Sequence, residues 1–284
     1  MNRRTLLMGF GVLGATALSG GGTVYALNVF GLAPKAPPAI ETAAKDSHGA
    51  AVAKDDAHAD APHWSYDGAT GPDRWGDLED GNALCKLGGA QSPVDLSGAM
   101  RVAALAGLQT AYGSTRVKVT NNGHTFQVNA DKGSTLTLDG KKYDLLQFHF
   151  HTPSEHTVDG KSFPLEMHLV HQAADKSLAV IGVFIAEGSP NVVLGKFWEK
   201  MPKAQGEVDT GVSIDIKELL PRATDEYFTY AGSLTTPPCS ESVRWVVLKQ
   251  PIQASKTQIA SFRTVFAANA RPTLPLGARH LLSS

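Results

Sequence analysis

The chain has 284 residues, of which 42% are hydrophobic and 19% are charged, enough for one sizeable domain and, by length alone, for two. Its 26 basic and 27 acidic side chains leave a formal net charge of −1 at pH 7. This balance, together with the lack of a basic patch interleaved with aromatic residues, argues against a nucleic-acid-binding protein and fits a small-molecule substrate.

The first 33 residues have the pattern of an export signal. A short basic head, Asn2–Leu7, contains two adjacent arginines, which is also compatible with a twin-arginine signal, and no charged residue follows until Lys35. Ala15–Ala17 and Val24–Ala26 are alternative cleavage sites. The uncharged run is long enough for a membrane span, although Gly20–Gly22 interrupts it. We expect a cleaved signal, with a retained anchor as the alternative, and a periplasmic domain in either case.

Residues 34–62 form a predicted linker. They are rich in Ala, Pro, Asp and Lys and show no apolar periodicity, so they cannot bury enough surface to become ordered. We therefore expect a disordered linker, with the folded domain at residues 63–284.

The chain contains two cysteines, Cys85 and Cys239. Two cysteines in an exported protein predict one disulfide bond. Two separate buried thiols are the alternative. Because Cys239 lies four residues after Thr235, a bridge would also hold the segment that carries this threonine.

From His63 onward, short strand patterns separated by turn residues predominate. Asp139-Gly140 predicts a hairpin turn, and Val192–Met201 and Lys256–Asn269 are the two predicted helices. We predict a single, predominantly β domain of the α+β class with a few peripheral helices. The predicted strands are Arg116–Thr120, Thr125–Asn129, Thr135–Leu138, Tyr143–His151, Leu178–Ala186 and Val243–Leu248.

Three histidines on two of these segments predict a metal site. Alternate residues of a strand share a face, so His149 and His151 point one way and Phe148 and Phe150 the other. His168 follows on a second strand pattern, and if the two strands are neighbours, three imidazoles converge. Three protein ligands with one open position is the arrangement of a catalytic zinc. An exposed polar face is the alternative, but the flanking phenylalanines favour burial, and buried histidines without partners are costly.

Two more residues fit this prediction. Gln147 lies two residues before His149 on the same face, and Glu166 lies two residues before His168 on its face. A ligating histidine needs a partner for its second ring nitrogen, which fixes its tautomer and orientation. We therefore predict Gln147 and Glu166 as the hydrogen-bonding partners of the metal ligands.

Five segments carry a resemblance to a known family. They are Ser92–Asp95, Gln147–His151, Ser154–Asp159, Glu166–His171 and Gly232–Pro238. From about Trp64 to Leu282 the chain resembles the α-class carbonic anhydrases, in a bacterial, exported form. The resemblance implies a central, largely antiparallel twisted sheet of about ten strands, with one zinc ion per chain at the bottom of a conical cleft. It also implies reversible hydration of carbon dioxide to bicarbonate and a proton by attack of a zinc-bound hydroxide.

The resemblance also assigns roles to further residues. Thr235 would accept the proton of the hydroxide, and Glu155 would accept the proton of Thr235, so that the nucleophile presents a lone pair to the substrate. His124 would be the proton shuttle, because a histidine that titrates near neutral pH can relay a proton to buffer. The implied substrate-binding residues are Val170, Val180, Leu234, Thr235, Thr236, Val243 and Trp245, and the implied water network contains Tyr66, Asn122 and Gln127.

Two other histidines of the matching segments are expected to be structural. His171 lies on the strand face opposite His168, and His156 directly follows Glu155 and is expected to hydrogen-bond to Glu166. As partners, the resemblance implies sulfonamide and anion inhibitors at the zinc and leaves a homodimer open. Membrane contact is expected only if the N-terminal segment is retained.

Two other functions are compatible with the same fold. A non-catalytic binding module would usually lack one zinc histidine, and here all three are present. A different zinc hydrolase, such as an esterase, is the second alternative; the sequence has no Gly-x-Ser-x-Gly nucleophile motif. The ratio of turnover on carbon dioxide to turnover on an activated ester distinguishes a carbonic anhydrase from an esterase.

Overall fold

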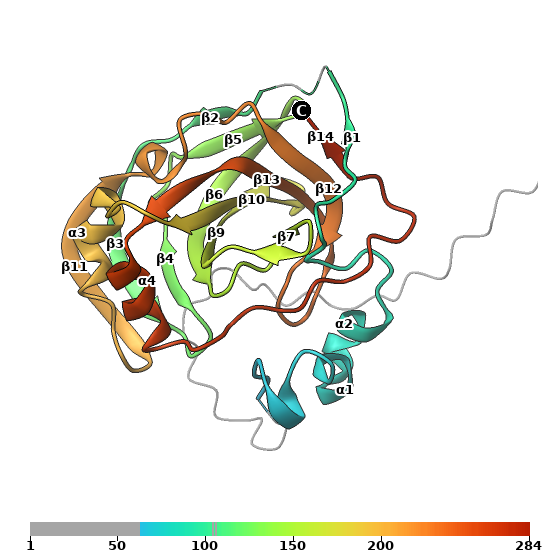
Figure 1. Ribbon diagram of the computed structural model, residues 1–284, viewed down its shortest axis with the longest axis horizontal. Helices are drawn as coiled ribbons and strands as arrows, with labels where there is room; N and C mark the ends of the chain where they lie inside the picture. The colour runs from blue at the N-terminus through green and yellow to red at the C-terminus, as the bar shows by residue number, and fades with distance from the viewer. Residues whose placement is uncertain (1–62, 104, 106) are drawn as a thin grey trace, which may run out of the picture. The chain divides into compact units, whose positions relative to one another are not determined.

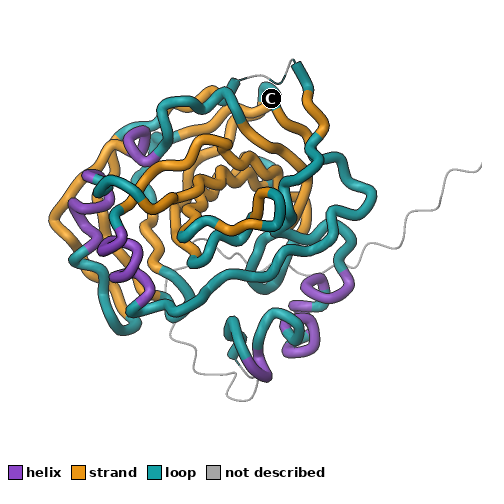
Figure 2. The backbone as a smooth tube through the Cα atoms, viewed as in Figure 1, coloured by secondary structure: helices purple, strands orange, loops and turns teal. Residues whose placement is uncertain are grey.

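The alternating strand patterns pair into one large sheet. The structure is a computed structural model that describes residues 63–284 except Ala104 and Ala106, so the predicted export signal and linker lie outside the described residues. Strands occupy the centre of the fold and helices its periphery (Figures 1 and 2). Among the described residues, no helix combines the length and apolar character that a membrane span requires.

The main sheet contains twelve strands. Their bounds are β1 Met100–Arg101, β2 Gln109–Ala111, β3 Ser114–Asn121, β4 Phe126–Asn129, β5 Thr135–Leu138, β6 Lys141–His151, β9 Leu165–Ala173, β10 Leu178–Glu187, β11 Gly206–Asp215, β12 Tyr227–Ser233, β13 Glu241–Ala254 and β14 Leu282–Ser283, while β7 Thr157–Val158 and β8 Lys161–Ser162 form a separate pair. The order is β1-β14-β12-β13-β10-β9-β6-β4-β3-β11, with β5 pairing β6 and β2. Only β1–β14 and β10–β13 are parallel among these pairs, so the predicted large, mostly antiparallel sheet is confirmed.

The helices are short. Their bounds are α1 Trp75–Leu78, α2 Leu84–Leu87, α3 Val192–Trp198 and α4 Lys256–Arg263, with 3₁₀ turns η1 Gly68–Thr70, η2 Asp80–Asn82 and η3 Ile216–Leu219. The first predicted helix therefore ends at Trp198 rather than Met201, and a turn follows in which the Met201 N–H donates to the Trp198 carbonyl at 3.4 Å.

The second predicted helix, Lys256–Asn269, was too long. It begins with a capping box at Ser255, as its sequence favours, but ends at Arg263. The chain beyond it is held by the sheet, because the backbone N–H of Asn269 donates to the carbonyl of Thr152 at 2.9 Å. This long-range bond overrides the local helical preference.

The β5–β6 hairpin turns as predicted. Asp139 and Gly140 have φ angles of 51° and 76°, the left-handed pair of a type I′ turn. The turn sets the register of β5 against β6, the strand that carries two of the three histidines.

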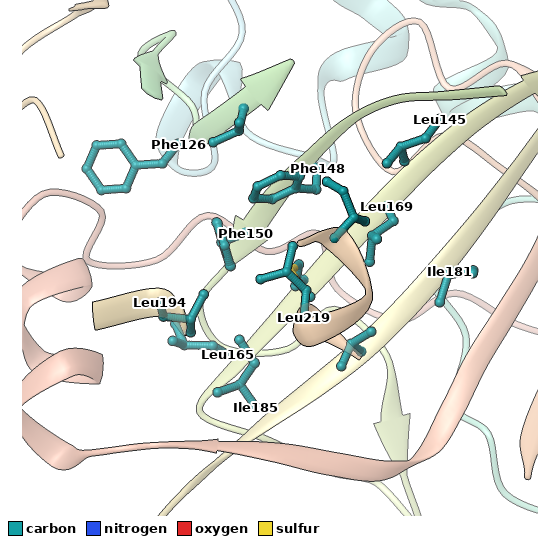
Figure 3. Close-up of a cluster of buried hydrophobic side chains, with 14 of the residues drawn as sticks. Phe126, Leu145, Phe148, Phe150, Leu165, Leu169, Ile181, Ile185, Leu194 and Leu219 are labelled. Atoms are coloured by element: carbon teal, nitrogen blue, oxygen red, sulfur yellow. The ribbon is translucent and has the colours of Figure 1, made fainter. Parts of the chain in front are cut away.

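A bulge in β6 decides which side chains face the core. The pairing of β6 with β9 shifts between Leu145 and Gln147. Tyr143 and Leu145, before the shift, therefore lie in the same apolar cluster as Phe148 and Phe150 after it, although simple alternation would separate them. Figure 3 shows Leu145, Phe148 and Phe150 in this cluster. The histidines of β6 consequently face the opposite side of the sheet from this core.

Candidate metal centre

The pairing of β6 with β9 brings the three predicted ligands together. His149 stands directly opposite His168 in the register, and His151 lies two residues further along β6. The ring centroids of His151 and His168 are 4.6 Å apart, and those of His149 lie 5.0 Å and 5.2 Å from them. One ring nitrogen of each histidine lies within 4.8 Å of the others, so a single ion can contact all three.

The two predicted partners occupy the remaining ring nitrogens of two ligands. Gln147 Oε1 lies 2.8 Å from His149 Nδ1, and Glu166 Oε1 lies 3.0 Å from His168 Nε2. His149 Nε2 and His168 Nδ1 are left to face a metal, an orientation of the kind that partners of metal ligands impose.

The partner of the third ligand was not predicted from the sequence. His151 Nδ1 lies 2.7 Å from the backbone carbonyl of Asn269, a residue 118 positions away. The Asn269 amide donates to the carbonyls of His124 and Phe150 at 2.9 and 3.0 Å, and its Oδ1 accepts from the N–H of Thr152. A backbone acceptor leaves no mark in the residue types, so no local pattern could have revealed it.

The protonation of the cluster suits a metal. Burial, reinforced by His151 and His168, holds the pKa of His149 well below its usual range. Burial also lowers the pKa of His151, although Glu155 acts in the opposite direction. Both rings are therefore neutral at pH 7, as ligands must be.

Two buried polar atoms in the described region also point to a ligand. His151 Nε2 and Glu155 Oε2 have no hydrogen-bond partner, and they lie 3.5 Å apart. An orphaned buried nitrogen is costly unless something binds it. Three imidazoles around one point are the donor set of a catalytic zinc, so these residues fit that ion.

Glu166 is anchored on both sides. Its Oε1 lies 2.8 Å from His156 Nδ1, and its Oε2 accepts from the His156 N–H at 2.9 Å, as expected for that histidine. His156 Nε2 in turn lies 2.7 Å from the Tyr230 hydroxyl. Burial alone would raise the pKa of Glu166, but His156 and His168 hold it well below its usual range. Glu166 is therefore an ionised acceptor for His168.

Glu155 and Thr235 approach the centre from different segments. Glu155 follows β6, and its Oε1 accepts from the backbone N–H of Arg271 at 2.9 Å. Thr235 is buried in the loop between β12 and β13. Within the described part of the chain, no hydrogen bond joins the two side chains, so their predicted hydrogen bond stays a prediction.

The predicted substrate wall forms one apolar cluster. It is separate from the core in Figure 3 and lies on the face of the sheet that carries the histidines. Thr236 is half-buried in the same loop as Thr235. The wall residues in this cluster are Val170, Val180, Val243 and Trp245, with Leu234 packed against them.

The predicted disulfide is present. Cys85 and Cys239 are joined, with Cα atoms 5.0 Å apart, and there is no free cysteine in the chain that the structure describes. The bridge ties α2 to the loop that carries Thr235. Arg271 reinforces the same region, because its guanidinium donates to the carbonyls of Cys85 and Ser92 at 2.9 and 2.8 Å.

His124 lies in the turn between β3 and β4. Asn122 Oδ1 accepts from the backbone N–H groups of His124 and Thr125, both at 2.9 Å, and so fixes this turn. The His124 ring stacks on Trp64, with centroids 3.6 Å apart and planes 9° apart. Burial, and to a smaller extent the neighbouring His63, lowers the pKa of His124 to about 4, below the neutral range that the sequence suggested.

The other two residues of the predicted water network differ in their environments. The Tyr66 hydroxyl is buried and, among the described residues, has no hydrogen-bond partner. Burial and Glu155 raise its pKa well above the usual range, so it stays protonated. Gln127 Nε2 donates to Asn129 Oδ1 at 2.8 Å.

The chain is similar to known proteins. A family model described as eukaryotic-type carbonic anhydrase matches residues 70–284. A carbonic anhydrase from a Nostoc strain is 44% identical over 234 residues, covering 80% of this chain and 88% of that protein. One from Neisseria gonorrhoeae is 41% identical over 225 residues, covering 78% of this chain and 88% of that protein.

The chain is also similar to proteins of known structure. The α-carbonic anhydrase of Thermovibrio ammonificans, in complex with the inhibitor sulfanilamide, is 45% identical with a TM-score of 0.75, covering 78% of this chain and 98% of that one. Dioscorin complexed with ascorbate is 28% identical with a TM-score of 0.73, again covering 78% and 98% of the two chains.

Proposed function

The chain belongs to the eukaryotic-type, or α-class, carbonic anhydrase family, and we propose that it is a zinc enzyme acting on carbon dioxide and bicarbonate. The observation that supports a metal site is the convergence of three ring nitrogens within 4.8 Å. Each belongs to a histidine whose other ring nitrogen has a hydrogen-bond partner. His149, His151 and His168 would hold the ion. When bound, zinc acidifies the water that completes its coordination, a property established for carbonic anhydrases, and so supplies a nucleophile at neutral pH.

The residues around the three histidines would orient the ligands and the nucleophile. Gln147, Glu166 and the carbonyl of Asn269 would fix the tautomers of the three imidazoles and direct their other ring nitrogens inward. Glu155, already bound through Oε1 to the chain at Arg271, has Oε2 left to accept the proton of Thr235. With its proton committed in this way, the Thr235 oxygen can only accept, which turns a lone pair of the nucleophile toward the substrate.

The apolar cluster beside the histidines would bind carbon dioxide. The substrate has no net dipole, so it is held by an apolar wall and not by charged groups. Val170 and Val180 pair across β9 and β10, and Trp245 packs against His168 with ring centroids 4.8 Å apart. These contacts bring the apolar cluster beside the histidines that would hold the metal.

His124 would carry the released proton away from the metal centre. Asn122 fixes its turn, and Tyr66 and Gln127 lie on neighbouring segments as candidates for ordering the intervening waters. A positioned imidazole that passes protons to buffer fits this step.

The enzyme is proposed to work outside the cytoplasm. The described domain contains a disulfide, and such bonds persist in oxidising compartments. Export of the domain would then depend on the predicted N-terminal signal.

Stopped-flow hydration of carbon dioxide, with zinc quantified in the same sample, tests the proposal. We expect about one zinc per chain and fast hydration that sulfonamides inhibit. His168→Asn should lose both zinc and activity, whereas His280→Asn, at an exposed histidine, should keep both. Zinc binding by the wild-type chain without hydration would contradict an enzyme and favour a binding module.

A further inference from the structure

A second histidine contacts the proposed proton shuttle. His63 Nε2 lies 2.8 Å from His124 Nε2, and the two ring centroids are 4.8 Å apart. Two ring nitrogens at this distance must share one proton, so one ring donates and the other accepts. The contact is therefore a ready path for a proton from one imidazole to the other.

The two rings differ in their access to solvent. His124 is half-buried and stacked on Trp64, while His63 is exposed. Both line a hollow of about 420 Å³, together with Asp67, Gln205 and others. A buffer molecule can thus reach His63 directly, whereas the stacking partner covers one face of His124.

His124 is also a weak base. Burial and the neighbouring His63 lower the pKa of His124 to about 4, so at neutral pH its protonated form is short-lived. A proton on such a ring passes on readily to a second acceptor that lies within hydrogen-bonding reach. His63 is such an acceptor in the described part of the chain.

We propose that His63 is the second carrier of the exit path, taking the proton from His124 and releasing it to buffer. This inference rests on the proposed function. A proton arriving on His124 Nδ1 forms a new N–H bond there; the His124 Nε2–H bond breaks as the His63 Nε2–H bond forms; and His63 loses its Nδ1 proton to the buffer base. One proton enters and one leaves. Exchange of the ring protons with water returns both rings to their starting tautomers.

Two substitutions separate proton transfer from simple contact. His63→Ala removes the ring, while His63→Gln keeps a side chain that can hydrogen-bond to His124 but cannot carry a proton at neutral pH. His280→Gln changes an exposed histidine elsewhere and is the matched control. All are made in the full chain, and hydration is followed in weak buffer and in buffer with added imidazole.

We expect both His63 variants to lower kcat about fivefold in weak buffer, with kcat/KM unchanged, and imidazole to restore kcat. The value of kcat/KM reports the carbon dioxide step, which His63 does not touch, and so separates the relay from damage to the fold. His280→Gln should leave both parameters unchanged.

Three results would overturn the relay. Unchanged kcat in His63→Ala would remove His63 from the path. Wild-type kcat in His63→Gln together with a loss in His63→Ala would reduce His63 to a residue that positions His124. A parallel fall of kcat and kcat/KM would indicate a structural role. Failure of the proposed function is distinguishable from these, because the wild-type chain itself would then show no hydration, and both proposals would be refuted.

Discussion

Glu166 contacts two histidines at once, so we expect its charge to affect metal binding. Its Oε1 lies 2.8 Å from His156 Nδ1 and 3.0 Å from His168 Nε2. Glu166→Gln replaces one acceptor oxygen by an NH₂ donor, so one of the present contacts is lost or opposed. We expect zinc affinity, measured by competition with a chelator, to fall about 10- to 100-fold. Glu187→Gln, at the exposed end of β10, is the control, and equal affinity in the two variants would contradict the prediction.

His171 is a buried histidine outside the metal centre, and its titration should affect stability. Its Nε2 lies 2.7 Å from the Tyr112 hydroxyl, and burial lowers its pKa from 6.5 to about 4. Above pH 6.5 the ring is neutral in the folded and unfolded chain alike. As the pH falls from 6.5 toward 4, the unfolded chain takes up a proton that the folded chain does not, so this contribution to stability is lost. The full shift corresponds to about 3 kcal/mol.

Denaturant unfolding of the zinc-free protein over this pH range measures the effect. The free energy of unfolding should fall with decreasing pH in the wild-type chain and should fall less steeply in His171→Gln, which cannot take up the proton. Zinc is removed so that protonation of the metal ligands on zinc release does not add to the slope. Identical slopes would show that His171 does not titrate in this range.

Strand β10 approaches the metal centre closely at Gly182. This residue pairs with His168 across β9, and an added Cβ would meet Glu166 Oε1 at 2.9 Å and a methyl of Val247 at 3.3 Å. Glu166 is held by His156 and cannot retreat without losing a bond. Gly182→Ala should therefore destabilise the fold by about 1–3 kcal/mol.

The same substitution should weaken zinc binding, because the displaced carboxylate no longer orients His168. Melting temperature and chelator competition together measure both effects. Gly113→Ala, where an added Cβ meets no atom within 4 Å, is the control and should change neither quantity. A Gly182→Ala protein that lost stability but kept its zinc affinity would separate packing from metal orientation.

Strand patterns predicted most of the elements, but not the irregularities that place them. Alternation over Gln147–His151 was enough to put two histidines on one face, because the regular part of β6 begins there. The bulge just before it was not predictable, since Leu145 and Phe148 are both apolar and the pattern alone does not show which of them changes side. The end of α4 was missed for a related reason, because the bonds of Asn269 to β6 are not encoded in the helical segment.

At the scale of the whole molecule, the contacts that could not be predicted from the sequence are long-range, and two of them involve the backbone. Arg271 donates its backbone N–H to Glu155, 116 residues away, and Asn269 accepts from His151 through its carbonyl. His63 reaches His124 across 61 residues. The cluster of His149, His151 and His168 was predictable because its residue type and spacing are specific to metal chemistry, whereas a backbone acceptor can be supplied by any residue.

The Cys85–Cys239 bond joins the start of the domain to the loop that carries Thr235, so it links stability to the proposed catalytic geometry. The Cys239 N–H donates to the Thr236 carbonyl at 2.8 Å, and Gln91 Nε2 donates to the Cys239 carbonyl at 3.0 Å. The bridge spans 154 residues of sequence, and chain entropy predicts a stabilisation of about 5 kcal/mol for so long a loop.

Replacing both cysteines by serine should therefore lower the melting temperature and also reduce kcat/KM several-fold, because the loop that holds Thr235 loses one of its attachments. Differential scanning calorimetry and stopped-flow hydration, both well below the melting temperature of the variant, measure the two effects. The wild-type chain treated with a reductant should behave in the same way, which excludes an effect of the serines themselves. A lower melting temperature with unchanged kcat/KM would leave the bond a stabilising role and would show that Leu234–Ser240 keeps its shape through hydrogen bonds alone, such as that from the Leu234 N–H to the Ser240 carbonyl at 2.9 Å.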